Sequence, residues 1–142
     1  MSMARLFKAI GSIIVTFLIF FGVPVFVYSS FQRFLGMVPP AKLTQAAVYQ
    51  LASLKGAEAF ILVFIFLMVI ERRRGKEGRY AFFISLLLFI QAGVISELWY
   101  YLTLKSPELY TAAGIVSSFI SYMLSGWLLG RFYKTTSHMI LP

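Results

Sequence analysis

The chain has 142 residues, of which 60% are hydrophobic and 13% carry a formal charge, and its formal net charge is +8. An ordinary soluble domain is about 45–50% apolar and about 25% charged, so this composition excludes a soluble globular enzyme and a disordered chain. The remaining class is an integral membrane protein, and the charge spacing predicts where its helices lie.

The first predicted element is a membrane-spanning helix near 10–28. No charged residue occurs from 9 to 32, and a helix needs roughly 20 apolar residues to cross about 30 Å of hydrocarbon. A signal peptide is the competing interpretation, because a short basic start precedes the apolar run. The apolar core of a signal peptide is about 7–15 residues long and is followed by a small-residue cleavage site. This run is longer and no such site follows it, so we expect a retained helix.

Three further spanning helices are expected, near 46–70, 80–102 and 109–130. The second span is charge-free only from 59 to 70, which is too short to cross a bilayer alone. It must therefore include upstream residues, through Glu58 and Lys55, with the double proline at 39–40 as a natural start. The short connection between the last two spans makes them an antiparallel hairpin of neighbours.

The predicted fold is an all-α integral membrane protein, a single membrane domain over 1–142 that folds as an antiparallel bundle of four transmembrane helices. Lys and Arg set its orientation, because cytoplasmic loops carry an excess of both. Nine of the 13 lie at the ends that carry both termini and the 71–79 hairpin. The other four are Arg33, Lys42, Lys55 and Lys105. This bias predicts a multi-pass membrane protein with both termini on the cytoplasmic side.

The hairpin at 71–79 is strongly basic. The net charge raises the possibility of nucleic-acid binding, but this hairpin is too short to form a binding domain, and we expect no nucleic-acid partner. The general explanation is a topology anchor that also touches anionic lipid headgroups. The more specific interpretation is a docking patch for an acidic partner subunit. Its basic residues are Arg72, Arg73, Arg74, Lys76 and Arg79.

Three ionisable residues, Lys55, Glu58 and Glu97, fall inside the apolar spans. A charge at the bilayer centre costs about 2.5–3.5 kcal/mol, so such residues are candidates for a functional site. At about 1.5 Å of rise per residue, Glu58 and Lys55 lie about 18 and 22 Å above the inner end of their span, and Glu97 lies about 24 Å above the start of its own.

These depths predict a polar cluster in the outer half of the membrane, in which Lys55 pairs with Glu58, Glu97 or both. Lys55 and Glu58 are three residues apart and share a helix face. The cluster is either a structural ion pair that snorkels towards water or a ligand or ion site. Possible supporting partners are Tyr49, Gln50, Ser53 and Gln91.

The last span carries small residues at a spacing of four. This spacing puts them on one face of the helix, where another backbone can approach closely. The pattern predicts tight packing against a helix of this chain or of another protein. The small residues form one ridge of Ala113, Ser117, Ser121 and Ser125 and a G-x-x-x-G pair of Gly126 and Gly130.

The sequence offers no catalytic constellation. It contains no Cys, and this excludes thiolate nucleophiles, iron–sulfur clusters and Cys-based zinc sites. It contains a single His, His138. No nucleophile–base pair and no phosphate-binding loop is present either. We therefore expect no enzyme activity, no metal and no cofactor.

The leading hypothesis is a small non-catalytic membrane subunit or accessory protein of a larger complex, contributing packing, lipid contacts and assembly. Its expected partners are membrane lipids and either other membrane subunits or further copies of itself. The alternative is a small oligomeric proton- or ion-coupled transporter or channel that uses Glu58 as its intramembrane carboxylate. A third possibility is a lipid- or quinone-binding membrane enzyme with acid–base groups near the outer interface.

Overall fold

The protein is an all-α bundle of four long apolar helices, each long and apolar enough to cross a membrane. The computed structural model describes residues 3–38, 44–72 and 75–137. The third helix consists of three consecutive segments, of which the middle one is π-helical. The elements are α1 (Met3–Leu35), α2 (Gln45–Arg72), α3 (Glu77–Leu88), the π-helical η1 (Phe89–Ile95), α4 (Ser96–Leu104) and α5 (Glu108–Ser137). The predicted fold class and helix count are confirmed at this level, and each helix is longer than its predicted span.

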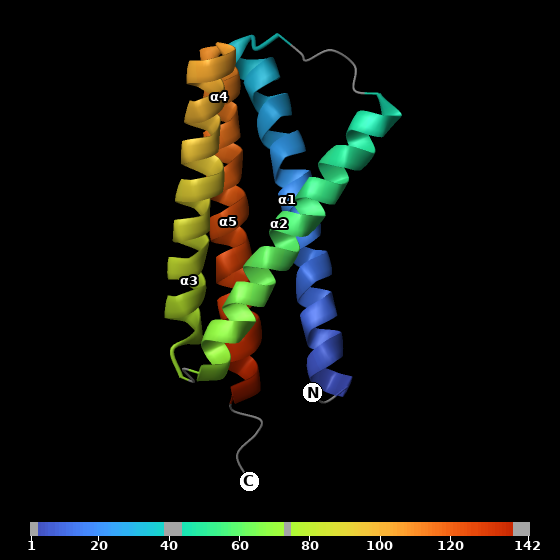
Figure 1. Cartoon of the computed structure of the whole chain (residues 1–142), viewed down its shortest axis with the longest axis vertical. Coiled ribbons are helices and arrows are strands. Elements are labelled where there is room, and N and C mark those ends of the chain that lie inside the picture. The colour runs from blue at the N-terminus through green and yellow to red at the C-terminus, as the bar shows by residue number, and fades with distance from the viewer. Residues whose placement is uncertain (1–2, 39–43, 73–74, 138–142) are drawn as a thin grey trace.

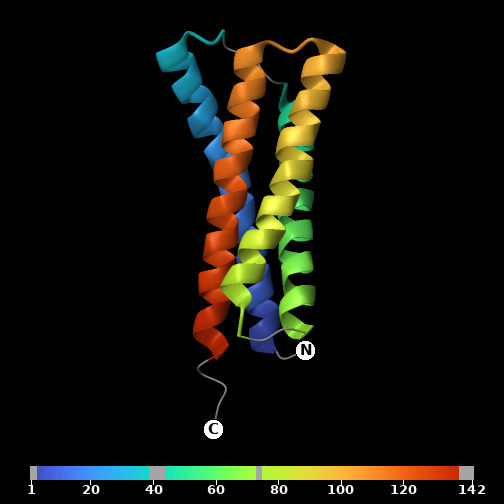
Figure 2. The same ribbon diagram turned by 90° about the vertical axis from the view of Figure 1, so that its left-hand side faces the viewer.

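Successive helices run in opposite directions (Figure 1). The start of α1, the turn between α2 and α3 and the finish of α5 therefore lie at the same end of the bundle, which we call the terminal end (Figures 1 and 2). The opposite end, which we call the distal end, carries the α4–α5 loop and the chain that leaves α1.

The helix boundaries follow from local chemistry. Thr44 precedes α2 and its Oγ1 accepts a 3.2 Å hydrogen bond from the Ala47 backbone N–H, which satisfies one free donor of the first turn. The double proline predicted to start this helix lies outside the described residues. At the terminal end, Gly75 has a φ of 90°, a left-handed value that suits glycine, and its N–H donates a 2.8 Å hydrogen bond to the Glu77 carboxylate.

The hydrophobic core occupies the half of the bundle nearest the terminal end. Every buried residue of the described part of α2 lies between 59 and 66, and none lies between 45 and 58. In the third helix, α4 has no buried residue. The buried side chains of this core are Phe20, Ala59, Leu62, Val63, Phe66, Ala81, Ile84, Tyr122 and Leu129.

Helix α1 packs against α5 along the whole length of the bundle. Near the terminal end Lys8 Nζ lies 4.5 Å from the centre of the Tyr133 ring, and further along the rings of Phe20 and Tyr122 are 4.8 Å apart. At the distal end Val27 and Met37 form a second small core with Ala113, and the Tyr110 hydroxyl donates a hydrogen bond to the Val38 carbonyl. The distal end is thus closed between α1 and α5.

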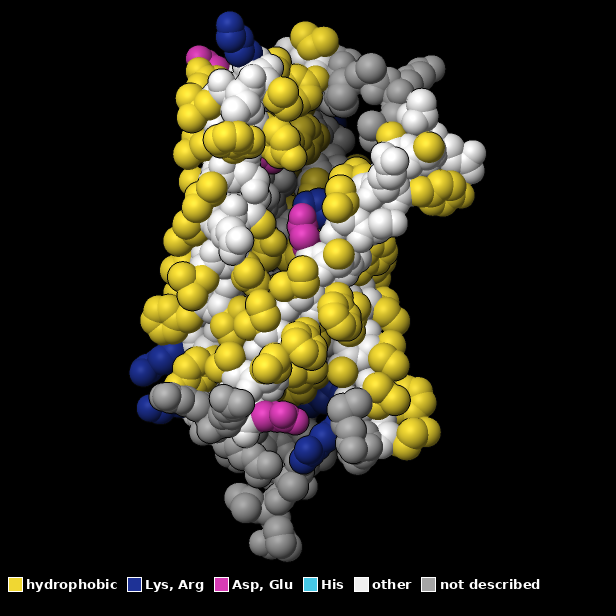
Figure 3. Space-filling view, in the orientation of Figure 1, with side chains coloured by type: hydrophobic (Ala, Val, Ile, Leu, Met, Phe, Trp, Pro, Cys, Tyr) yellow, Lys and Arg dark blue, Asp and Glu magenta, His cyan; other side chains and the backbone are white. Residues whose placement is uncertain are grey.

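Helix α2 diverges from the third helix towards the distal end (Figure 1). It packs mainly against α1 and α3, near the terminal end. The space-filling view shows a hollow between the distal half of α2 and the third helix, with basic and acidic side chains inside it (Figure 3). We call this hollow the lateral opening.

Small residues bring α5 against the third helix. A Cβ added at Gly126 would overlap the Ser85 side chain, and one added at Gly130 would lie 2.9 Å from the Gly78 Cα. A Cβ added at Gly93 of η1 would lie 2.8 Å from the Ser118 Cβ. Apolar burial does not drive helices together in lipid, so this close packing supplies much of their attraction.

A Gly126→Ala substitution should therefore lower the thermal stability of the detergent-solubilised protein, because the added methyl has no room beside Ser85. Overpacking of this kind costs about 1–3 kcal/mol of unfolding free energy. The matched control is Gly11→Ala in α1, where a Cβ meets nothing within 4 Å. Its unfolding temperature should stay level or rise slightly, and equal losses in both variants would contradict this packing.

Candidate functional site

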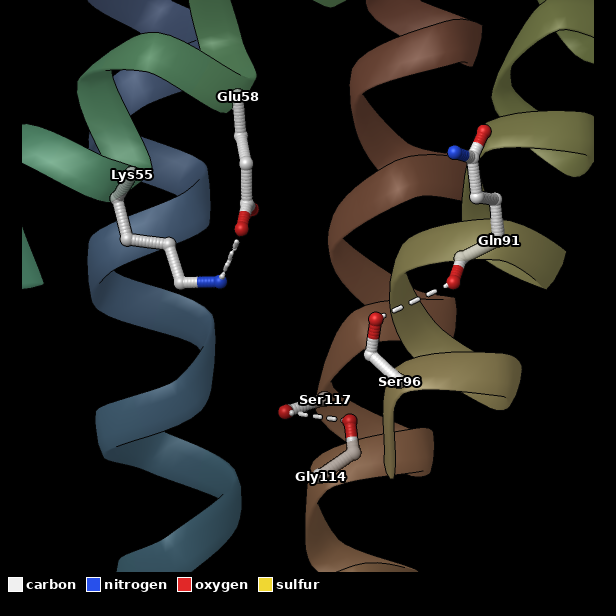
Figure 4. A network of polar contacts seen from close by, with 6 residues as sticks. All are labelled: Lys55, Glu58, Gln91, Ser96, Gly114 and Ser117. Atoms are coloured by element: carbon white, nitrogen blue, oxygen red, sulfur yellow. Dashed lines mark hydrogen bonds and ion pairs between the residues drawn. The ribbon is translucent and has the colours of Figure 1, made fainter. Parts of the chain in front are cut away.

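The centre of the candidate site is an ion pair on α2. Lys55 Nζ lies 2.9 Å from Glu58 Oε2 and 3.2 Å from Oε1, so the ammonium bridges both oxygens. The side chains are 25% and 31% exposed, although the pair lies well inside an apolar helix. Figure 4 shows both side chains reaching from α2 across the lateral opening, towards α5 and the third helix.

Glu97 belongs to α4, the part of the third helix that lies across the lateral opening from α2 (Figure 1). It lies in the first turn of α4, and a Cβ added at Gly114 of α5 would overlap its carboxylate. The glycine thus makes room for this acid. Lys55 is close enough to Glu97 to attract it electrostatically across the gap. The structure therefore brings all three predicted residues to one place, with Glu58 as the direct partner of Lys55.

Glu97 has no direct hydrogen-bond donor within the described part of the chain. None of the described residues donates a hydrogen bond to its carboxylate or forms an ion pair with it. Lys55 and Glu58 neutralise each other, so an ionised Glu97 leaves the cluster with one negative charge in excess. Removing a carboxylate from water without a partner is costly, and such a group is stable only with a cation, with strong donors or with a proton.

The π-helical segment positions this acid. Ser96 Oγ donates a 3.3 Å hydrogen bond to the Gln91 carbonyl, five residues earlier, as the wider turn of η1 requires (Figure 4). A π-helical turn holds more residues than an α-helical one, so it rotates all later side chains relative to the earlier ones. Such turns are frequent at functional sites. Here the segment directly precedes the helix that carries Glu97.

The surrounding polar groups come from α1 and α5. The Ser117 hydroxyl donates a 3.0 Å hydrogen bond to the Gly114 carbonyl of its own helix and is buried (Figure 4). Tyr122 lies within electrostatic range of Glu58, and Tyr28 lies within that range of Glu97. Neither tyrosine is predicted from the sequence, because an isolated tyrosine in an apolar span carries no pattern. Only the depth of each residue in its helix would have given a signal.

The other polar residues named as supporting partners bond locally. Gln45 Nε2 donates to the Tyr49 hydroxyl, and Ser53 donates to the Tyr49 carbonyl, both along α2. The Gln91 side chain is exposed. Of the described polar groups on other helices, Tyr122 of α5 lies within electrostatic range of the ion pair.

The small residues of α5 divide between two environments. Gly126 and Gly130 meet α3 as described, whereas the serine ridge is buried inside the bundle. The Ser121 and Ser125 hydroxyls have no hydrogen-bond partner among the described residues, and neither does that of Ser85. The described part of the chain thus holds several buried hydroxyls that face neighbouring helices.

The basic hairpin is described only in part. Arg73 and Arg74 lie outside the described residues, and Arg72 ends α2. Lys76 and Arg79 are exposed at the terminal end, on either side of the buried Glu77. The hairpin stands at the far end of the bundle from the lateral opening, so the two features are separate.

The chain matches none of the protein-family models, curated proteins or solved structures with which it was compared. The geometry of the site itself is therefore the basis for assigning a function. Within the described residues, no group of three or more His, Cys, Asp or Glu is placed to hold a metal ion. The feature that remains is the half-exposed cluster of three charges in the lateral opening.

A double-mutant cycle on Lys55→Met and Glu58→Gln tests whether the ion pair stabilises the bundle. Each single change leaves one partner without its counter-charge, so the two losses of unfolding free energy should not add. We expect a coupling of about 1 kcal/mol or more in the detergent-solubilised protein. Lys76→Met, at the exposed terminal end, is the matched control and should change little. Strict additivity of the two losses would show that the pair is energetically silent.

Proposed function

We propose that the chain is a small non-catalytic integral membrane subunit, an accessory protein that contributes packing, lipid contacts and assembly to a larger membrane complex. The carrying observation is the lateral opening. The bundle has a well-filled core near its terminal end, while its distal half leaves an ion pair and a second carboxylate partly exposed at membrane depth.

Lipid is a poor environment for that exposed surface. Charged groups in transmembrane helices normally face the bundle interior, a water-filled cavity or a partner. A transmembrane helix of another subunit, placed in the lateral opening, would cover Lys55, Glu58 and Glu97 and complete the distal half of the core. This requirement favours an assembled protein over an isolated one.

The charge distribution supports an orientation for this subunit. The exposed basic residues Lys76 and Arg79 stand at the terminal end, with Arg5, Lys8, Arg131 and Lys134. Under the positive-inside rule the terminal end is cytoplasmic and the distal end faces outward. The basic residues would then contact anionic headgroups or an acidic surface of a partner. The lateral opening would lie in the outer half of the membrane.

Gentle solubilisation of the native membrane, followed by purification through this chain, tests the proposal. Unlike membrane proteins should co-purify at a fixed molar ratio that survives a second size-separation step. The ratio is measured by quantitative mass spectrometry of the peak. A chain that elutes alone, as a monomer or as copies of itself, would contradict the subunit role.

A second candidate is a small oligomeric proton- or ion-coupled transporter or channel. It is favoured by the position of Glu58, which faces the lateral opening with Lys55 as its counter-charge and Tyr122 nearby. An intramembrane carboxylate beside a cation is a common arrangement in proton relays and ion pathways. Four helices are too few to enclose a path alone, so this function would require several copies.

The transporter role predicts that Glu58→Gln abolishes ion or proton flux in proteoliposomes while the protein stays folded. The amide keeps the size of the side chain and removes its ability to carry a proton at physiological pH. Glu108→Gln, outside the lateral opening at the start of α5, is the matched control and should retain full flux. Absence of flux above empty liposomes for the unaltered chain would remove this candidate.

A further inference from the structure

We propose that the element filling the lateral opening is a transmembrane helix of the partner subunit that carries a Lys or Arg in its outer half, paired with Glu97. This inference rests on the proposed role as a subunit and specifies the chemistry of the partner. It concerns Glu97, whose carboxylate has no direct hydrogen-bond donor among the described residues.

The charges of the described residues determine the sign of the charge that the partner's side chain must carry. Glu58 already has Lys55 at 2.9 Å, whereas Glu97 has only the more distant attraction of the same lysine. The other groups near the opening are hydroxyls of tyrosine and serine, which donate hydrogen bonds but do not neutralise charge. Among the described residues no further cation is placed at the cluster. A cation is therefore the complement that the described cluster lacks, and an anionic side chain would add to its excess.

The placement of Glu97 makes its carboxylate available to such a cation. Its carboxylate lies against Gly114, where a larger residue would displace it. The acid is therefore held at the junction of α4 and α5, within electrostatic range of Lys55 on α2. A helix entering between α2 and α4 would pass beside this carboxylate, and a bidentate Arg or a Lys could pair with it there.

Depth favours a helix over a lipid headgroup as the occupant. With the terminal end at the inner boundary, Glu97 lies about 24 Å into a hydrocarbon layer about 30 Å thick, so its carboxylate is still within the apolar layer. A headgroup amine sits outside the hydrocarbon, whereas a transmembrane helix presents side chains at every depth.

The test is site-specific photo-crosslinking in the native membrane. Leu51 is exposed and lies four residues before Lys55 and seven before Glu58, so all three share the face of α2 that borders the opening. A benzophenone amino acid replaces Leu51, and the cross-linked peptide is sequenced by mass spectrometry. The control places the same probe at Phe60, which is exposed on the other side of α2.

We expect the Leu51 probe to label a transmembrane peptide of an unlike protein that contains a Lys or Arg in its outer half. Glu97→Gln should reduce the yield of this product about tenfold or more, because a buried charge loses its partner. Glu108→Gln, a carboxylate outside the opening, should leave the yield unchanged. Neutralising the partner's basic residue should cause the same loss as Glu97→Gln, which covers the case in which the latter variant misfolds.

Four outcomes would overturn the inference. They are labelling of lipid alone, labelling of a second copy of this chain, a labelled helix without a basic residue in its outer half, and an unchanged yield in both the Glu97→Gln variant and the partner variant. The proposed function fails separately, when no unlike protein co-purifies at a fixed ratio. A stable complex in which the yield of the Leu51 cross-link is unchanged by Glu97→Gln and by the partner variant would therefore refute the charge pairing and leave the subunit role intact.

Discussion

The close approach of α5 to the third helix is the contact on which the rest of the structure depends. Gly126 and Gly130 allow the backbone of α5 to meet α3 near the terminal end, with Ser85 and Gly78 as the facing residues. Helices in lipid gain little from burying apolar surface, so backbone proximity and dispersion must hold them together. This contact and the α1–α5 contact make α5 the most enclosed helix, with 44% of its spanning window buried against 22% for each of the others.

The same arrangement leaves α2 closely packed along only half of its length. Its buried residues lie between 59 and 66, and the preceding turns diverge from the bundle. Those turns carry Lys55 and Glu58, which pair with each other because no described residue of another helix offers a closer counter-charge. Charged residues inside transmembrane helices normally face the bundle interior or a water-filled cavity and pair with one another, and they are candidates for a functional site. The fold thus links the loose packing of α2 to the proposed partner.

The sequence predicts the site better than it predicts the contacts within it. Charge spacing along two antiparallel spans places Lys55 and Glu97 at similar depth, and in the structure the two lie within electrostatic range of each other. Two details depend on how the helices are rotated relative to one another. They are which acid pairs directly with Lys55, and the packing of the Glu97 carboxylate against Gly114. That rotation depends on the π-helical segment, which shifts the phase of every residue after it and has no signature in the hydrophobic pattern.

The sequence by itself determined the number of helices, their approximate positions and the presence of charges inside them. These are one-dimensional properties, because the thickness of the bilayer converts an apolar run directly into a spanning helix. Only the tertiary structure decided that α2 diverges, that Tyr28 and Tyr122 lie beside the acids, and that the opening faces sideways. Helix tilt and rotation are set by side chains far apart in the chain that pack against one another, so they are not contained in any single span.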